Sequence, residues 1–142
     1  MPSPDDRGQL ASDLTVYAAR LVRLVRRSHT RSAGTRVLSI LDETGPLGVS
    51  ALAQADQCSQ PTMTGQVKQL VELGWVAREA NPADARGSLI WLTDAGRDEL
   101  ARVRHAAADL VTERLDHTHH STADLATAVA VLRAVLDEQE TS

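Results

Sequence analysis

The chain has 142 residues, of which 42% are hydrophobic but only 2% aromatic, and it contains no phenylalanine. It is long enough for one domain whose core is built from leucine, valine and alanine, a composition typical of a mostly helical protein. No apolar run is long enough to span a bilayer, and the N-terminus has no apolar signal region. These observations exclude a membrane-embedded protein, and we expect no membrane among its partners. The single cysteine, Cys58, cannot form an internal disulfide, so we expect a reducing, cytoplasmic location.

Charge is unevenly distributed along the chain. The net charge is −4, but residues 1–41 carry seven arginines against three acids, whereas residues 93–142 carry five basic and ten acidic residues. Binding depends on the local potential at a surface rather than on the overall count. The acidic total therefore does not exclude a nucleic-acid partner.

Two helices are predicted in the first third of the chain. Apolar residues recur at helical spacing over residues 10–25, and the arginines there lie largely off the apolar stripe. Residues 29–34 are predicted to break this helix. A short helix follows over residues 35–43, and the glycines and proline of residues 44–48 cannot continue it.

Two further short helices, joined by a tight turn, come next. Ser50 is a candidate N-cap for a helix at residues 51–56, and Ser59 for a second helix that tolerates Pro61 in its first turn. Gly74 is a natural residue to follow that helix. Its buried stripe is predicted to be Met63, Val67, Leu70 and Val71. Its exposed face is polar and nearly uncharged, with Thr62, Thr64, Gly65, Gln66, Lys68 and Gln69.

A β-hairpin and two long helices complete the chain. Residues 75–79 and 88–92 have strand character, and a pairing centred near Ala83 would place Trp75 opposite Trp91. A third strand at residues 47–49 is compatible with the pattern. Thr93 is expected to cap a long helix, which residues 116–121 interrupt before a last helix marked by apolar residues over 125–136.

This order of elements predicts a mainly α protein with a winged helix-turn-helix. The major groove of B-form DNA is wide enough to admit a helix, and Thr, Gln and Lys can bond to base edges and phosphates. Ser59 and the free N–H groups of its helix can hold a phosphate. Arg86, on the hairpin, is placed to enter the minor groove, where the negative potential is concentrated. Asp84 can hold its guanidinium through a bidentate pair.

The stretch SQPTMTGQVKQLVELGWVAREANPADARGSLIWLTDAG, residues 59–96, resembles the MarR family of transcriptional regulators. That family has a capped recognition helix ending in Leu-x-x-x-Gly-Trp/Leu-Val-x-Arg, a wing with Asp-x-Arg-Gly, and a strand ending in Leu-Thr-x-x-Gly. The matching positions are Leu70, Gly74, Trp75, Val76 and Arg78, then Asp84, Arg86 and Gly87, then Leu92, Thr93 and Gly96. The resemblance covers about residues 10–136.

The resemblance implies roles for individual residues. Major-groove contacts would come from Thr62, Thr64, Gln66 and Lys68, next to Ser59 and Gln60 at the start of the helix. Arg86 would enter the minor groove, and Asp84 would orient it or pair with Arg78. Gly65 departs from the family, whose members often carry arginine there, so the target sequence or the affinity is expected to differ.

The predicted domain organisation follows from the apolar stripes. Residues 1–9 form a flexible tail, 10–33 a dimerisation helix, 34–93 the DNA-binding domain and 94–142 the C-terminal dimerisation helices. The stripes outside the winged helix would leave a large apolar surface on a monomer, which a second copy covers. The resemblance likewise implies a homodimer, acting on a pseudo-palindromic operator with half-sites about 10 bp apart.

The resemblance also implies a repressor that a small aromatic or lipophilic ligand releases. Tyr17, Arg20 and Leu24 are candidates for lining the ligand cleft, although a plain dimer interface explains Tyr17 and Leu24 equally well. The arginines of residues 20–36 either offset repulsion beneath the duplex or line this cleft.

Two weaker signals have ordinary explanations. His117, His119 and His120 form a cluster of a kind that binds zinc or nickel, but it also fits a solvated loop, which we favour. Cys58 is interpreted as a packing residue. We therefore predict no metal, no cofactor and no enzymatic activity. One alternative is a winged-helix module that binds protein. The other is a metalloenzyme that uses the histidine cluster, but the sequence has no general base at a fixed spacing from these histidines.

Overall fold

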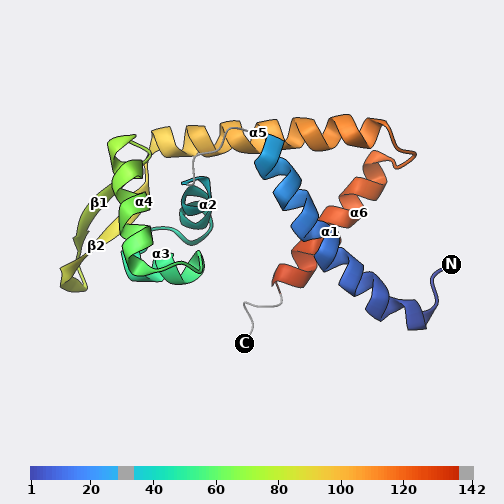
Figure 1. Ribbon diagram of the computed structural model, residues 1–142, viewed down its shortest axis with the longest axis horizontal. Coiled ribbons are helices and arrows are strands. Elements are labelled where there is room, and N and C mark those ends of the chain that lie inside the picture. Colours follow the sequence, from blue (N-terminus) through green and yellow to red (C-terminus); the bar gives the residue numbers. More distant parts are fainter. Residues whose placement is uncertain (29–33, 138–142) are drawn as a thin grey trace. The chain divides into compact units, whose positions relative to one another are not determined.

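The structure, a computed structural model, describes residues 1–28 and 34–137. The described residues are mainly helical, with one small antiparallel sheet, as predicted (Figure 1). The elements in chain order are η1 (Pro4–Asp6), α1 (Arg7–Ser28), α2 (Thr35–Thr44), α3 (Val49–Ala55), α4 (Gln60–Glu72), β1 (Val76–Asn81), β2 (Asp84–Leu92), α5 (Asp94–Asp116) and α6 (Thr122–Asp137).

The first helix begins earlier than its apolar spacing predicts. α1 starts at Arg7, directly after the 3₁₀ turn η1. Ser3 caps that turn: its hydroxyl accepts from the backbone N–H of Asp5, and Asp6 accepts from the N–H of Ser3 at 2.7 Å. Capping by polar side chains extends helical structure into a segment without an apolar stripe. The predicted break at residues 29–34 lies outside the described residues except for Gly34.

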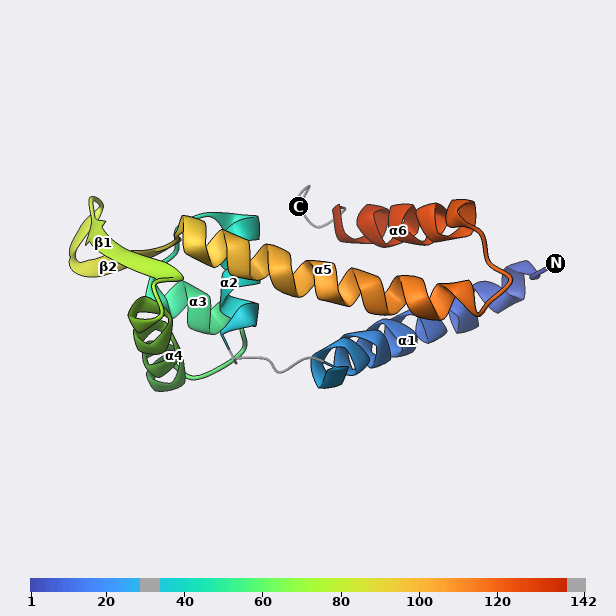
Figure 2. The same ribbon diagram turned by 90° about the horizontal axis from the view of Figure 1, so that it is seen from above.

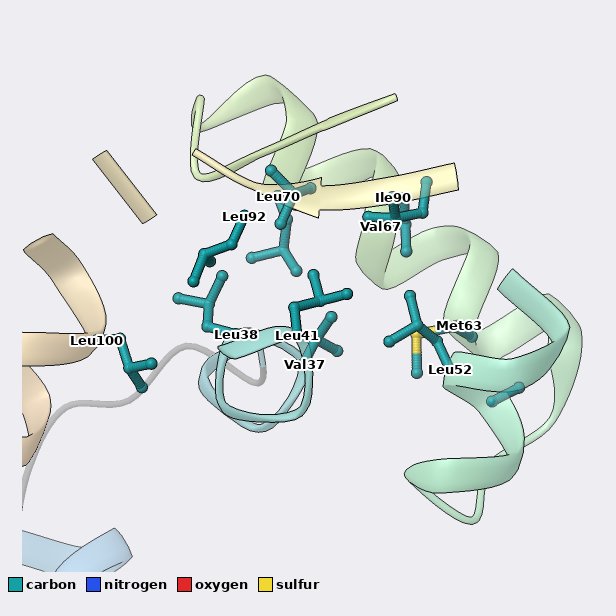
Figure 3. Close-up of a cluster of buried hydrophobic side chains, with 12 residues drawn as sticks. Val37, Leu38, Leu41, Leu52, Met63, Val67, Leu70, Ile90, Leu92 and Leu100 are labelled. Carbon is teal, nitrogen blue, oxygen red and sulfur yellow. The ribbon is translucent and has the colours of Figure 1, made fainter. Parts of the chain in front are cut away.

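The core of the winged-helix part is aliphatic. It packs α2, α3 and α4 against β1, β2 and the start of α5, and Figure 3 shows the side chains of α2 directed at those of α4 and β2. The fully or almost fully buried members are Val37, Leu38, Leu41, Leu52, Met63, Val67, Leu70, Val76, Ile90, Leu92 and Leu100. Val71, predicted to belong to the buried stripe, is instead 37% exposed. No aromatic ring belongs to this cluster, and Trp75 packs against its edge.

The hairpin differs from the predicted pairing by two residues. Trp91 lies opposite Ala77, not opposite Trp75, and Val76 pairs with Leu92. Trp75 precedes the strand because its N–H donates to the carbonyl of Leu70 at 3.0 Å, in the turn that ends α4. The prediction assumed a symmetric loop, whereas the hairpin contains a bulge that moves the centre of pairing.

The predicted third strand is reduced to a single bridge. Leu47 and Ile90 exchange two backbone hydrogen bonds, of 3.1 and 2.8 Å. Pro46 offers no N–H on one side, and on the other side Gly48 already serves as the N-cap of α3. Ser50, predicted to be that cap, lies inside the helix, where its hydroxyl accepts from the amide of Gln60 at 2.9 Å.

The C-terminal part follows the predicted pattern. α5 ends at Asp116 and α6 begins at Thr122, so the interruption lies where the sequence predicts it. The chain forms two compact units, which divide between Ala107 and Ala108. Within residues 1–28 and 34–137, every helix falls short of the length and apolar content that a bilayer crossing requires.

Candidate nucleic-acid interface

α3 and α4 form the helix-turn-helix, and their connecting turn is held from α2. Arg36 of α2 forms an ion pair with Asp56 at 2.6 Å and donates to its carbonyl at 3.0 Å. The Asp56 side chain is only 6% exposed. Gln57, next in the turn, has a φ of 55°, a left-handed conformation that lets the chain reverse between the two helices. These contacts fix where α4 begins.

The N-terminus of α4 is capped as predicted. The Ser59 hydroxyl accepts from the backbone N–H of Thr62 at 3.2 Å and donates to the Thr62 hydroxyl at 2.8 Å. Thr64 donates its hydroxyl proton to the carbonyl of Gln60 at 2.9 Å. All four side chains are exposed. The Thr64 oxygen is therefore left to act as an acceptor toward a ligand.

The remaining residues of the candidate recognition face are not equally accessible. Lys68 and Gln69 are exposed, whereas Gln66 is half-buried. Its amide oxygen is buried and has no hydrogen-bond partner among the described residues. Gln66 lies three residues after Met63 and beside Val67, so it borders the stripe that packs on the core. The prediction that it belongs to the open face is thus only partly correct.

The wing places Arg86 in a bulge. Ala80 pairs with Ser88 but Asn81 pairs with Asp84, so residues 85–87 of β2 have no partner on β1. Bulges re-aim side chains at the rims of sheets. Arg86 is exposed, and the hairpin tip projects away from the helices that it joins (Figure 2).

Asp84 supports the bulge through the backbone. Its carboxylate accepts from the N–H of Arg86 at 3.0 Å, while the Asn81 side chain accepts from the N–H of Ala83 at 3.0 Å. Among the described residues, no ion pair joins Asp84 to the guanidinium of Arg86 or Arg78. Both guanidinium groups are exposed and available to an anion.

The other candidate residues lie outside the winged helix, on α1 and in the loop between α5 and α6. On α1, Tyr17 is 60% exposed, the Arg20 guanidinium lies 5.4 Å from its ring centroid, and Leu24 is half-buried. His120 contacts Asp124 at 3.3 Å. No group of three metal-binding side chains converges anywhere in the part of the chain that the structure describes, His117 and His119 included.

Comparison with known proteins places this arrangement in a family. Residues 32–88 match the model of the MarR family. An HTH-type transcriptional regulator of Mycobacterium bovis, described as uncharacterized, is 30% identical over 139 residues, which cover 94% of this chain and 97% of that protein. The chain belongs to the MarR family. It is therefore a DNA-binding transcriptional regulator.

Solved structures of MarR-family proteins share the fold. A MarR family protein from Bacillus stearothermophilus superposes with a TM-score of 0.70 at 21% identity, over 99% of this chain and all of the other. BpsR of Bordetella bronchiseptica superposes with a TM-score of 0.55 at 21% identity, over 96% and 99% of the two chains. Its structure was described as a mechanism by which 6-hydroxynicotinic acid regulates DNA binding.

Several residues of the MarR motif serve the fold rather than the interface. The Thr93 hydroxyl donates to the carbonyl of Gly74 at 2.6 Å and accepts from the N–H of Gly96 at 3.1 Å. The N–H of Thr93 also donates to the carbonyl of Trp75 at 3.1 Å. Gly74 itself has a φ of 76°, which favours glycine. The two ends of the hairpin are thus tied together.

Sequence reasoning missed the residues that hold this MarR-family interface in place. Arg36 and Asp56, 20 residues apart, give no signal in a single sequence, because their pairing depends on how α2 packs on the helix-turn-helix. The role of Thr93 was predicted only as a helix cap. Its bond to Gly74, 19 residues earlier, also requires the fold.

Proposed function

We propose that this MarR-family regulator binds a pseudo-palindromic operator as a homodimer, represses transcription there, and is released by a small aromatic or lipophilic ligand. Each copy contributes one α4 to the major groove and one wing to the adjacent minor groove. The candidate contacts are Ser59, Gln60, Thr62, Thr64, Gln66, Lys68, Arg78, Asp84 and Arg86.

The capped and exposed helix α4, on the same domain as an exposed arginine in a bulged wing, carries the proposal. Its free N–H groups and hydroxyls suit phosphates and base edges. The guanidinium of Arg86 forms no ion pair among the described residues, so its positive charge is available to DNA. Gln66 is the weakest member of the set, because it is half-buried.

The apolar surface of α1 and α6 supports the homodimer. Neither helix has a buried residue. On α1 the exposed fractions of Leu10, Leu21 and Val22 are 52%, 45% and 48%, and on α6 those of Val135 and Leu136 are 57% and 66%. Exposed apolar area of this extent marks a protein contact. A second copy is the partner that a two-fold operator requires.

A ligand response is supported by BpsR, whose DNA binding 6-hydroxynicotinic acid regulates. Tyr17, Arg20 and Leu24 remain the candidates for a cleft on α1. The guanidinium of Arg20 lies over the Tyr17 ring, an arrangement that keeps a cation next to an aromatic surface.

The test is a titration of the full-length protein with duplex DNA from upstream of its own gene, at several salt concentrations. We expect a log–log slope of affinity against salt of about −5 to −10, because a dimer neutralises several phosphates. Absence of binding, or an affinity that does not change with salt, would contradict operator binding and favour a winged-helix module that binds a protein.

Arg86→Ala isolates the wing in the same titration. We expect binding to weaken by about 1–3 kcal/mol while the protein stays dimeric. Arg102→Ala is the matched control, because Arg102 is exposed but paired with Glu99 on α5. If the two variants bind equally well, the wing does not contact the DNA.

A further inference from the structure

A cavity of about 360 Å³ lies within the winged-helix part, and its lining includes none of the candidate DNA contacts. It is formed where the end of α2, the following loop, both strands of the hairpin and the first turn of α5 meet. The lining residues are Leu41, Gly45, Pro46, Glu79, Trp91, Leu92 and Arg97. Binding sites for small molecules generally measure about 300–1,000 Å³, so this volume suits a ligand of one or two rings.

Trp91 gives the cavity an aromatic wall. The neighbours Ile90 and Leu92 are buried in the core, and successive side chains of a strand alternate between faces, so Trp91 lies on the other face of the hairpin. Its partner across the strands is Ala77, which is too small to cover an indole. Trp91 therefore remains 36% exposed. An uncovered indole offers a stacking surface to another flat ring.

Arg97 and Glu79 give the cavity one positive and one negative group. Arg97 contacts only Asp94 among the described acids, through one nitrogen at 3.4 Å, and its side chain is 59% exposed. The rest of the guanidinium can bind a carboxylate in bidentate fashion. Glu79 is exposed and has no ion-pair partner in the described part of the chain. It can accept from a hydroxyl or N–H group of a ligand.

We propose that this cavity binds a flat aromatic anion. The ring stacks on Trp91 beside Pro46, the carboxylate pairs with Arg97, and a donor on the ring faces Glu79. This site lies among residues different from the cleft candidates on α1. Its regulatory consequence rests on the proposed ligand response, but its occupancy does not require DNA.

The test uses the two indole N–H resonances of the full-length protein, recorded by ¹H–¹⁵N NMR without DNA. Naphthalene-2-carboxylate is the probe, and naphthalene-2-carboxamide is its neutral match. We expect the Trp91 resonance, assigned with Trp91→Phe, to shift and saturate with both compounds. Arg97→Gln should weaken binding of the carboxylate roughly tenfold or more and leave the carboxamide unchanged, because only the anion uses the bidentate pair.

Two variants sharpen the result. Glu79→Gln should bind the carboxylate at least as tightly as the wild type, because a negative charge is removed from the cavity. Arg102→Gln, on α5 outside the cavity, should bind as the wild type does. A carboxylate that leaves the Trp91 resonance unmoved, or binds Arg97→Gln normally, overturns the site. Shifts confined to the backbone amide resonances of α1 in the same spectra overturn it too, while leaving the ligand response and the DNA titration intact.

Discussion

Gly96 and Gly65 are the same residue type in opposite surroundings. A Cβ atom on Gly96 would lie 2.0 Å from the carbonyl oxygen of Trp75, which is backbone and cannot move aside. A Cβ atom on Gly65 would meet nothing within 4 Å. The close approach at Gly96 brings the start of α5 against the hairpin junction, so the Thr-x-x-Gly part of the motif has a packing cause.

Gly96→Ala is therefore expected to destabilise the fold by about 1–3 kcal/mol, the usual cost of forcing extra volume into a packed site. Gly65→Ala should stabilise it by up to about 1 kcal/mol, because alanine favours an exposed helix interior. Chemical denaturation of both variants beside the wild type checks the pair. A Gly96→Ala variant as stable as the wild type would show that close approach does not explain Gly96.

Single residues were predictable where the cause is local. Ser59 was recognised as an N-cap because its bonds reach only to Thr62. Ser50 was not assigned correctly, since its hydroxyl partner Gln60 belongs to the next helix. The half-burial of Gln66 likewise depends on which neighbours pack beside α4. The DNA-contact roles of these residues remain predictions.

The hairpin illustrates the same limit at the level of elements. Its two strands follow from β-branched and aromatic residues on both sides of a turn-rich loop. The bulge at residues 85–87 does not follow from them, because many loop conformations fit that composition. The helices, which depend on repeated local spacing, were located to within a few residues, whereas the pairing of the strands was wrong by two.

The start of α6 carries a titratable cap. Asp124 accepts from the backbone N–H of Ser121 at 2.9 Å, and the Ser121 hydroxyl accepts in return from the N–H of Asp124 at 3.2 Å. The Ser121 backbone bond, and next the contact with His120, lower the pKa of the Asp124 carboxyl. The charged form thus stabilises the folded helix.

Because the folded pKa of Asp124 is depressed, its contribution is complete above the unfolded value of about 3.9 and is lost as pH falls through the folded value. We expect Asp124→Asn to have a lower Tm than the wild type at pH 6, and the gap to close as pH approaches the folded pKa. Thermal unfolding at a series of pH values measures it. A gap that stays constant down to pH 3 would contradict a role for the charge.

At the scale of the whole molecule, the sequence contains more apolar helical surface than a single chain buries. The winged helix buries its own apolar residues in one core, while α1 and α6 keep apolar residues exposed. This excess was visible in the sequence because amphipathic stripes are local patterns. How two copies pack together was not, since that depends on contacts between chains.

Leu132→Glu tests the proposed dimer. Leu132 is an apolar residue of α6 that is 38% exposed in the single chain. A charge there should give a monomer in sedimentation equilibrium and lower operator affinity roughly tenfold or more, because the second recognition helix is no longer tethered. Arg133→Glu, at the next position, changes charge without removing an apolar contact and should remain dimeric. A dimeric Leu132→Glu would move the interface elsewhere.

The bonds that join Thr93 to Gly74 and Trp75 have a consequence for how such regulators diversify. The chain enters and leaves the hairpin at one place, where these bonds hold its two ends together. The length and tip of the hairpin can therefore change without disturbing the helices that pack beside it. In a regulator built in this way, the wing can become longer or shorter and contact a different DNA sequence, while the recognition helix keeps its position and its own contacts.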